Sequence, residues 1–413
     1  MSAGKPQLDT TSLADISWDD VLPVASSPGS NTGQIYDETL QLGKVSNTAD
    51  PRVYLLKLRA KVPGSANLTI RFAGAGQSVT CGEIRLKVMP VILPQNQNLT
   101  IEAGVWPATQ TEDQVSATIR LLQEYGFNAF SRVWRPGDPR TLSRIVAAAA
   151  KFRPIKSIRL PVPRMIHNGQ PEATFDESAI DNWADESAEE IKSYETAMRP
   201  LGIGLAYEIW DEPRPEFADQ LLAYVSAMRR RVPGVSLQIT AAPESEFVGR
   251  IKVDTWIVPI SRLRPDILDS GRRAGGQLWL YSNRWHGIDR PANTLRIAGW
   301  ALWANDLSGY YFWGINRGTA DVRGGGKART FQRDNLVYPI GRSGIAGSVR
   351  LEMFQEGLQD YALLRLLGTC RIADGALSAD LASIRGMRKL DSLADQDIDS
   401  LHGRLLAALV SCK

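Results

Sequence analysis

The stretch GIGLAYEIWDEPRPEFADQLLAYVSAMRRR, residues 202–231, joins two different periodicities. Residues 202–210 form an apolar run bounded by turn residues, which is typical of a buried strand. The apolar residues of 216–231 recur at intervals of three and four, which predicts an amphipathic helix. Between them stand two adjacent carboxylates, Asp211 and Glu212, followed directly by a proline. A strand that leads straight into a helix is the unit from which parallel α/β sheets are built.

The same strand-then-helix unit recurs from Leu99 onward. Helical patterns separate the strand candidates, as in residues 140–152, and only the segment 242–252 leaves no room for more than a short helix. This alternation predicts an α/β fold with a (β/α)8 TIM-type barrel. An open, doubly wound sheet is the alternative, but no glycine-rich phosphate loop follows the first strand. The eight predicted strands are residues 99–106, 128–134, 156–162, 202–210, 235–241, 253–258, 277–283 and 309–316.

The two ends of the chain differ from this central part. Residues 52–91 contain three runs that alternate apolar and polar side chains, with turn residues between them, which predicts short antiparallel strands. After the last strand candidate the chain returns to helical spacing. We therefore expect an N-terminal antiparallel β-sandwich over residues 1–93, the (β/α)8 barrel over 94–368 and a cap of C-terminal helices over 369–413.

Composition narrows the classes of function. The 413 residues carry a formal net charge of +3 without a basic stripe, which argues against a nucleic-acid partner. No apolar run reaches the roughly 18–20 residues of a membrane span. Since Cys81, Cys370, Cys412 and the three histidines are scattered, neither a metal site nor an organic cofactor is predicted. The N-terminus lacks the layout of a signal peptide, so we expect a cytoplasmic location, or a periplasmic or secreted one if a leader has been removed.

Active sites of (β/α)8 barrels collect at the C-terminal ends of the strands. Of the predicted strands only the fourth ends in carboxylates, Asp211 and Glu212, which are the catalytic candidates. Eleven tryptophans and eleven tyrosines, many near predicted strand ends, suit stacking against sugar rings, so a glycan is the expected substrate. The candidate substrate-binding residues are Arg132, Trp134, Arg159, Trp210, Tyr281, Asn283, Tyr311, Trp313 and Asn316.

The adjacent acids suit a glycosidase in which the substrate supplies the nucleophile. Most glycosidases need two carboxyl groups on either side of the scissile bond. Here the substrate's own 2-acetamido group would attack the anomeric carbon, while one acid protonates the leaving oxygen and the other stabilises the charge on the acetamide. Successive side chains of a regular strand point to opposite faces, so both acids can serve only if the backbone is irregular. Pro213 cannot donate to the strand ladder and predicts such an irregularity.

Other interpretations of these residues stay open. Asp211 could be the N-cap of the following helix. Trp210 and Trp313 could be core aromatics, and the arginines at the strand ends could form ion pairs, one of them with a buried Glu208. Two further candidate acids, Glu244 and Glu246, follow the fifth predicted strand.

Three stretches of the chain resemble glycoside hydrolase family 123 and the related catalytic domains once labelled domain of unknown function 4091. WDEP (210–213) matches an adjacent Asp-Glu pair of that family, and GYYFWGIN (309–316) resembles its apolar strand ending in an aromatic pair and an asparagine. SVRLEMFQEGLQDYALLRLL (348–367) resembles its closing helix, with Arg350, Glu352, Gly357, Asp360 and Tyr361 in register. The resemblance extends over residues 99–367. It implies that Arg350 and Glu352 lock the closing helix to the barrel.

The resemblance also implies an activity, namely substrate-assisted cleavage of terminal β-linked N-acetylgalactosamine. By position, Glu212 would be the general acid/base, and Asp211 would orient the acetamido group and stabilise the oxazolinium. Tyr281 and Tyr311 would donate near the acetamido oxygen, and Trp313 would lie beneath the sugar.

We therefore expect a retaining exo-β-N-acetylgalactosaminidase or hexosaminidase. The chain departs from the family pattern at Gln355, where an arginine is usual, and in a less aromatic seventh strand, so two alternatives stay open. The first is a glycoside hydrolase of a bacterial polysaccharide without the acetamido group, which would need a second acid such as Glu208 or Glu244. The second is a non-catalytic glycan-binding protein.

Overall fold

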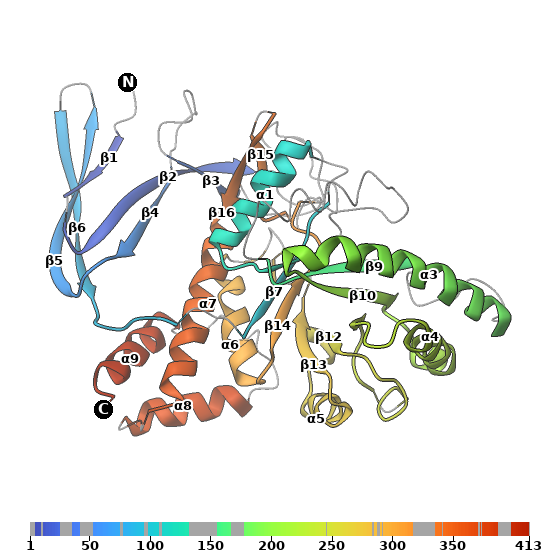
Figure 1. Ribbon diagram of the computed structural model, residues 1–413. Helices are drawn as coiled ribbons and strands as arrows, with labels where there is room; N and C mark the ends of the chain where they lie inside the picture. The colour runs from blue at the N-terminus through green and yellow to red at the C-terminus, as the bar shows by residue number, and fades with distance from the viewer. Residues whose placement is uncertain are drawn as a thin grey trace.

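The structure is a computed structural model in which the N-terminal sheets and the C-terminal helices both lie to one side of a barrel (Figure 1). The residues that it describes are 5–9, 11–24, 35–41, 53–74, 77–94, 98–106, 110–131, 155–166, 177–244, 246–282, 285–286, 290, 292–316, 335–340, 342–370, 372, 374–386 and 398–412.

The central sheet is a closed barrel of eight parallel strands, which confirms the predicted (β/α)8 fold. Its strands follow the chain order around the barrel, so that β14 pairs with β7 and closes the sheet. Most of their residues are buried, as expected for parallel strands covered by helices on the outside and filled with side chains on the inside. The strands are β7 (Thr100–Gly104), β8 (Ala129–Ser131), β9 (Ser157–Ile166), β10 (Gly204–Asp211), β11 (Leu237–Thr240), β12 (Thr255–Pro259), β13 (Gln277–Tyr281) and β14 (Gly309–Phe312).

Helices follow most of these strands, as the sequence pattern predicts. The first begins with a complete capping box, in which the side chains of Thr111 and Gln114 each accept a hydrogen bond from the other's backbone. Between β11 and β12 the described residues 246–250 form turns rather than a short helix. The helix predicted at 140–152 lies outside the described residues. Among the helices of the described residues, none is long and apolar enough to cross a membrane. The helices are α1 (Glu112–Glu124), α3 (Glu177–Met198), α4 (Ala218–Arg231), α5 (Pro265–Ala274), α6 (Ile297–Ala304) and, after the last barrel strand, α7 (Val349–Leu367).

The N-terminal part forms two antiparallel sheets, as expected from its alternating pattern. The smaller sheet has the order β1-β5-β6 and the larger one β15-β16-β3-β2-β4. The larger sheet was not fully predicted, because β15 and β16 come from the chain after the last barrel strand and join through the pairing of Ser348 with Glu38. These strands are β1 (Lys5–Leu8), β2 (Ala14–Val24), β3 (Ile35–Gln41), β4 (Val53–Ala60), β5 (Gly64–Gly74), β6 (Gln77–Val88), β15 (Tyr338–Ile340) and β16 (Gly344–Ser348).

Two charged residues of the closing helix α7 join it to both neighbouring parts. Arg350 is buried and donates to the backbone carbonyl of His286, in the loop after β13. Glu352 accepts from the hydroxyl of Tyr125 at the end of α1 and forms an ion pair with Lys57 of β4. The prediction that these two residues lock the helix to the barrel is confirmed, and Glu352 also reaches the N-terminal sheet.

Helices α6 and α7 cross where neither has room for a side chain. A Cβ atom on Gly299 would lie 1.7 Å from the carbonyl oxygen of Gly357, and one on Gly357 would lie 2.4 Å from that of Arg296. The glycine of the closing-helix motif therefore permits the backbones to approach closely.

Asp360 of the same motif is a buried acceptor for three side chains. Arg296 Nε donates to it at 2.8 Å and Trp300 Nε1 at 2.9 Å, and His402 Nδ1 lies 2.6 Å away. Burial alone would raise the pKa of Asp360, but the hydrogen bonds from His402 and Arg296 outweigh it and lower the pKa. The motif's aspartate thus fastens α6 and a C-terminal helix to α7.

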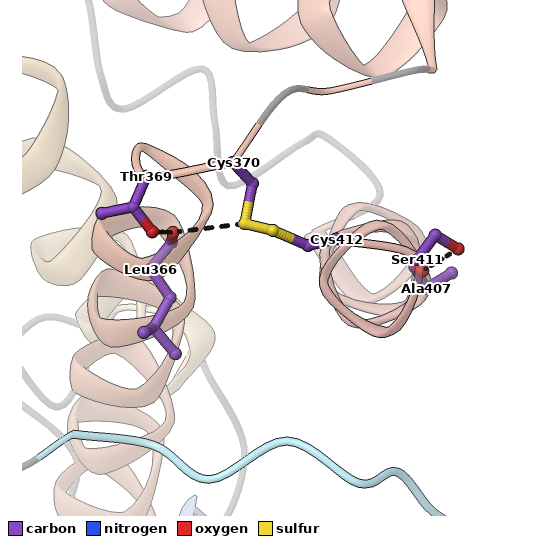
Figure 2. The surroundings of a disulfide bond; sticks show 6 residues. All are labelled: Leu366, Thr369, Cys370, Ala407, Ser411 and Cys412. Carbon is purple, nitrogen blue, oxygen red and sulfur yellow. Dashed lines mark hydrogen bonds between the residues drawn. A yellow bond between two sulfur atoms is a disulfide. The ribbon is translucent and has the colours of Figure 1, made fainter.

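A disulfide closes the C-terminal part of the chain. The helices α8 (Gly375–Gly386) and α9 (Ile398–Val410) follow α7, and Cys370 just after α7 is bonded to Cys412 just after α9 (Figure 2). The sequence did not predict this bond, because a separation of 42 residues gives no pairing signal. The disulfide holds the end of α9, the helix that brings His402 to Asp360.

Replacing Cys412 with serine is expected to lower the free energy of unfolding by about 2–4 kcal/mol, since the open chain gains entropy in the unfolded state. Chemical denaturation of protein prepared without reductant measures this difference. A Cys81→Ser variant is the matched control, because Cys81 is exposed and free, and its denaturation midpoint should not move. Equal midpoints for Cys412→Ser and the wild type would contradict the expectation.

Candidate active site

Strand β10 carries the two acids, and its side chains do not alternate regularly. The Tyr207 hydroxyl donates to a carbonyl of α3, so Tyr207 points outward, and Glu208 points into the barrel. Strict alternation would send Trp210 inward, but its ring stacks on Phe217 just before α4. The register of β10 shifts against both neighbouring strands in this region. The shift accounts for the outer position of Trp210, and if alternation resumes from there, Asp211 would face the inside of the barrel.

Glu212 follows with a left-handed backbone conformation, φ = 51°, which is uncommon for a residue with a side chain. Its N–H donates to the carbonyl oxygen of Thr240 at the end of β11, at 3.1 Å, and its side chain is exposed. The predicted irregular backbone at the acid pair is therefore confirmed. The N-cap interpretation of Asp211 is wrong, because α4 begins at Ala218 and Phe217 is its N-cap residue.

Below the acid pair lies a layer of buried charges. Arg159 of β9 is 2% exposed, and it donates to Glu102 of β7 at 2.7 Å and to Glu208 of β10 at 2.8 Å. Burial opposes the charge of Arg159, but the two carboxylates outweigh it and raise its pKa. Burial also raises the pKa of Glu102, although Arg159 lies beside it. The interpretation of Glu208 as the buried partner of a strand-end arginine is confirmed, and Glu102 is a partner that the sequence analysis missed.

Two predicted tyrosines pack against this layer. The Arg159 Cζ atom lies 3.9 Å from the centroid of the Tyr311 ring, and the Tyr281 ring stacks on Tyr311 with centroids 5.6 Å apart. Both tyrosines belong to one buried cluster with Trp279 and Ile257. The structure thus brings Arg159, Tyr281 and Tyr311 together inside the barrel, where Arg159 is a buried structural charge rather than an open contact residue.

Two half-buried tryptophans meet at the ends of β7 and β14. Trp313 and Trp106 pack edge to face, with ring centroids 5.6 Å apart. Asn316 is buried and its Oδ1 accepts from the backbone N–H of Trp106 at 2.7 Å, and its side-chain amide donates to the Trp106 carbonyl oxygen at 3.2 Å. Asn316 therefore joins the two loops. The sequence analysis missed Trp106, which the rule of C-terminal strand ends would have found if applied to the first strand.

A pocket of about 300 Å³ opens beside Glu212. Thr240 and Glu244 also line it, and the half-buried Glu244 lies 3.5 Å from Arg262. Glu246, the other candidate acid of this loop, is exposed and is not one of the lining residues that the structure describes. A carboxyl group at the edge of such a pocket can pass a proton to a group bound within it.

One predicted residue, Trp210, is not brought to this site, and three others cannot be placed from the described residues. Trp210 is fully buried against Phe217 and the edge of a tyrosine ring of α4, so it is a core residue, in agreement with the alternative interpretation. Arg132, Trp134 and Asn283 lie outside the described residues. Within the described part of the chain, no group of three His, Cys, Asp or Glu side chains could hold a metal ion.

The chain was compared with known families and with curated proteins. Residues 178–367 match the family model described as glycoside hydrolase 123, catalytic domain. The match begins in α3, includes Asp211 and Glu212, and ends with the last residue of α7. No curated protein matches the sequence.

The chain was also compared with solved structures, and two of those that are similar to it are glycoside hydrolases. A family 123 glycoside hydrolase from Clostridium perfringens, described in connection with glycolipid glycan hydrolysis, has a TM-score of 0.69 at 12% identity, with 99% of this chain and 90% of that chain covered. A family 39 glycoside hydrolase from Bacteroides cellulosilyticus WH2 has a TM-score of 0.45 at 14% identity, with 86% and 79% covered. At 12% identity the likeness to the first structure concerns the fold alone. The family match adds the activity: the chain carries a glycoside hydrolase family 123-like catalytic domain and is a glycoside hydrolase.

Proposed function

We propose that the protein is a retaining exo-β-N-acetylgalactosaminidase that uses substrate-assisted catalysis. The observation that carries the proposal is the adjacent pair Asp211 and Glu212 at the end of β10, where the register shift and the left-handed Glu212 release both side chains from strict alternation. Two neighbouring acids leave no room for a nucleophile and an acid on opposite sides of the bond, but they suit a substrate that attacks itself.

In the first step, the carbonyl oxygen of the 2-acetamido group attacks the anomeric carbon. Glu212 gives its proton to the glycosidic oxygen, which leaves with the electron pair of the broken bond. Asp211 accepts a hydrogen bond from the acetamide N–H and stabilises the positive charge of the oxazolinium. In the second step, a water molecule attacks the anomeric carbon from the face that the leaving group vacated, while Glu212 takes a proton from it. The bond between the anomeric carbon and the acetamido oxygen breaks with its electron pair, so the acetamide is restored and the β configuration is retained.

The aromatic residues would position the sugar. Trp313, with Trp106 at its edge, offers a flat apolar surface on which a sugar ring can stack. Tyr281 and Tyr311 are assigned as donors near the acetamido oxygen, and the Arg159 charge behind the Tyr311 ring favours a strongly polarised hydroxyl.

A second candidate is a glycoside hydrolase for a polysaccharide without the acetamido group. It needs another acid, and the two candidates, Glu208 and Glu244, differ in their position relative to the pocket beside Glu212. Glu208 is buried and accepts bonds from both Arg159 and Thr240, whereas Glu244 lines the same pocket as Glu212. Glu244 is therefore the second acid in this alternative. The non-catalytic alternative does not agree with the match to a catalytic domain.

Hydrolysis of three aryl glycosides by the wild-type protein tests the proposal. The aryl β-N-acetylgalactosaminide should be hydrolysed, the glucosaminide more slowly, and the β-galactoside, which has no acetamido group, not measurably. A galactosamine-derived thiazoline resembles the oxazolinium and should bind at least about 100-fold more tightly than the substrate. Hydrolysis of the β-galactoside without inhibition by the thiazoline would favour the second candidate.

A further inference from the structure

Thr240 connects the buried charges of the barrel with the backbone of Glu212. Its Oγ1 donates to Glu208 Oε1 at 3.0 Å, and its carbonyl oxygen accepts from the Glu212 N–H at 3.1 Å. Glu208 is in turn held by Arg159, whose Nη1 donates to the same Oε1 atom at 2.8 Å. One buried threonine therefore lies between a fixed ion pair and an exposed acid.

Glu212 needs such support because its backbone conformation is unfavourable. A left-handed conformation costs a non-glycine residue about 1–2 kcal/mol, and it persists only where neighbouring contacts enforce it. Pro213, which follows, has no N–H with which to anchor the turn. The bond to Thr240 is thus a main restraint on the direction in which the Glu212 side chain leaves the backbone.

Thr240 itself is the last residue of β11, a strand of only four residues. Its final partner on β10 is Asp211, so the end of β11 lies beside both acids. Strand ends open more easily than strand centres unless a side chain holds them. A hydroxyl bonded to a buried carboxylate is a charge-assisted anchor, and here that carboxylate is fixed by Arg159.

We propose that Thr240 is a positioning residue for the general acid. The hydrogen bond from Thr240 to Glu208 keeps the end of β11 in place, and the Thr240 carbonyl then holds Glu212 where its proton reaches the glycosidic oxygen. The proposal rests on the assigned role of Glu212 as general acid, but it does not depend on which sugar is cleaved.

The test uses leaving groups that differ in their need for a proton. A Thr240→Val variant keeps the shape of the side chain and removes the hydroxyl. For a phenyl glycoside its kcat should fall about 10- to 100-fold with KM within about threefold, because a small misplacement of a catalytic group is costly. For a dinitrophenyl glycoside, whose leaving group needs no protonation, kcat/KM, which reports the first step and not the later attack of water, should stay within about threefold. Thr240→Ser keeps the hydroxyl and should restore phenyl glycoside hydrolysis.

The matched control is the Thr255→Val variant. Thr255 is a buried threonine at the opposite end of the neighbouring strand β12, so this variant should hydrolyse both substrates like the wild type. Equal losses on both substrates, or no loss on either, would overturn the proposal for Thr240. If Thr240→Val does not fold, Thr240→Ala, which cannot clash, gives the same comparison. If the wild type cleaves only glycosides without the acetamido group, the proposed sugar is wrong, and the Thr240 test is made with those glycosides. A wild type that cleaves no glycoside overturns both proposals.

Discussion

Replacing Glu212 with glutamine is expected to lower kcat for an aryl β-N-acetylgalactosaminide with a poor leaving group by about 10²–10⁴-fold, the usual contribution of general acid–base catalysis. The amide keeps the shape of the side chain but has no proton to give. Because Glu212 is exposed and held through its backbone N–H, the substitution should leave the fold intact. Added azide should restore turnover of an activated substrate, since it attacks the oxazolinium without base assistance, and the product should be the β-glycosyl azide.

The controls separate the role of Glu212 from that of its neighbours. Asp211→Asn should lose activity to a similar extent without rescue by azide, since the lost interaction is with the acetamide rather than with a proton. Glu216→Gln is the matched control, because Glu216 is an exposed carboxylate on the same loop that is not a described lining residue of the pocket. Steady-state kinetics measure all three variants. Full activity in Glu212→Gln would falsify the assignment.

The barrel could be predicted because each of its strands shows a local pattern. An apolar run followed by a helical period marks most of the units, and short connections then leave few topologies open. The larger N-terminal sheet could not be predicted in full. The pairing of Ser348 with Glu38 joins segments more than three hundred residues apart in the printed sequence, and no local pattern encodes such a contact.

At the site too, features set by neighbouring residues could be predicted, whereas features set by contacts between separate strands largely could not. The acids Asp211 and Glu212, and the irregular backbone around them, followed from residue order and from the proline after them. The outward position of Trp210 did not, because a shift of one residue in a strand moves a side chain to the other face. The buried charges around Arg159 could be predicted only in part: a pairing with Glu208 was one interpretation of the sequence, but Glu102 was missed because it comes from a third, separate strand.

Replacing Arg159 with methionine is expected to lower the free energy of unfolding by about 3–5 kcal/mol, the usual cost of removing one partner from a buried ion pair. The variant leaves Glu102 and Glu208 buried without the cation between them. Chemical denaturation at neutral pH measures the loss. Arg230→Met is the matched control, because the ion pair of Arg230 with Asp181 is exposed and should contribute no more than about 1 kcal/mol.

The pH dependence of the Arg159→Met variant identifies the cause of its instability. A carboxyl group whose pKa is raised in the folded protein contributes stability at low pH, and that stability is lost as the pH rises. Burial already raises the pKa of Glu102 in the presence of Arg159, and without the cation the pKa of Glu102 should be raised further. The loss of stability should therefore shrink as the pH falls from neutral toward the ordinary glutamate value of 4.5. A Glu102→Gln/Glu208→Gln background should remove this pH dependence, since the amides carry no charge to neutralise. A loss that stays constant across this range would mean that Arg159 acts through packing rather than through its charge.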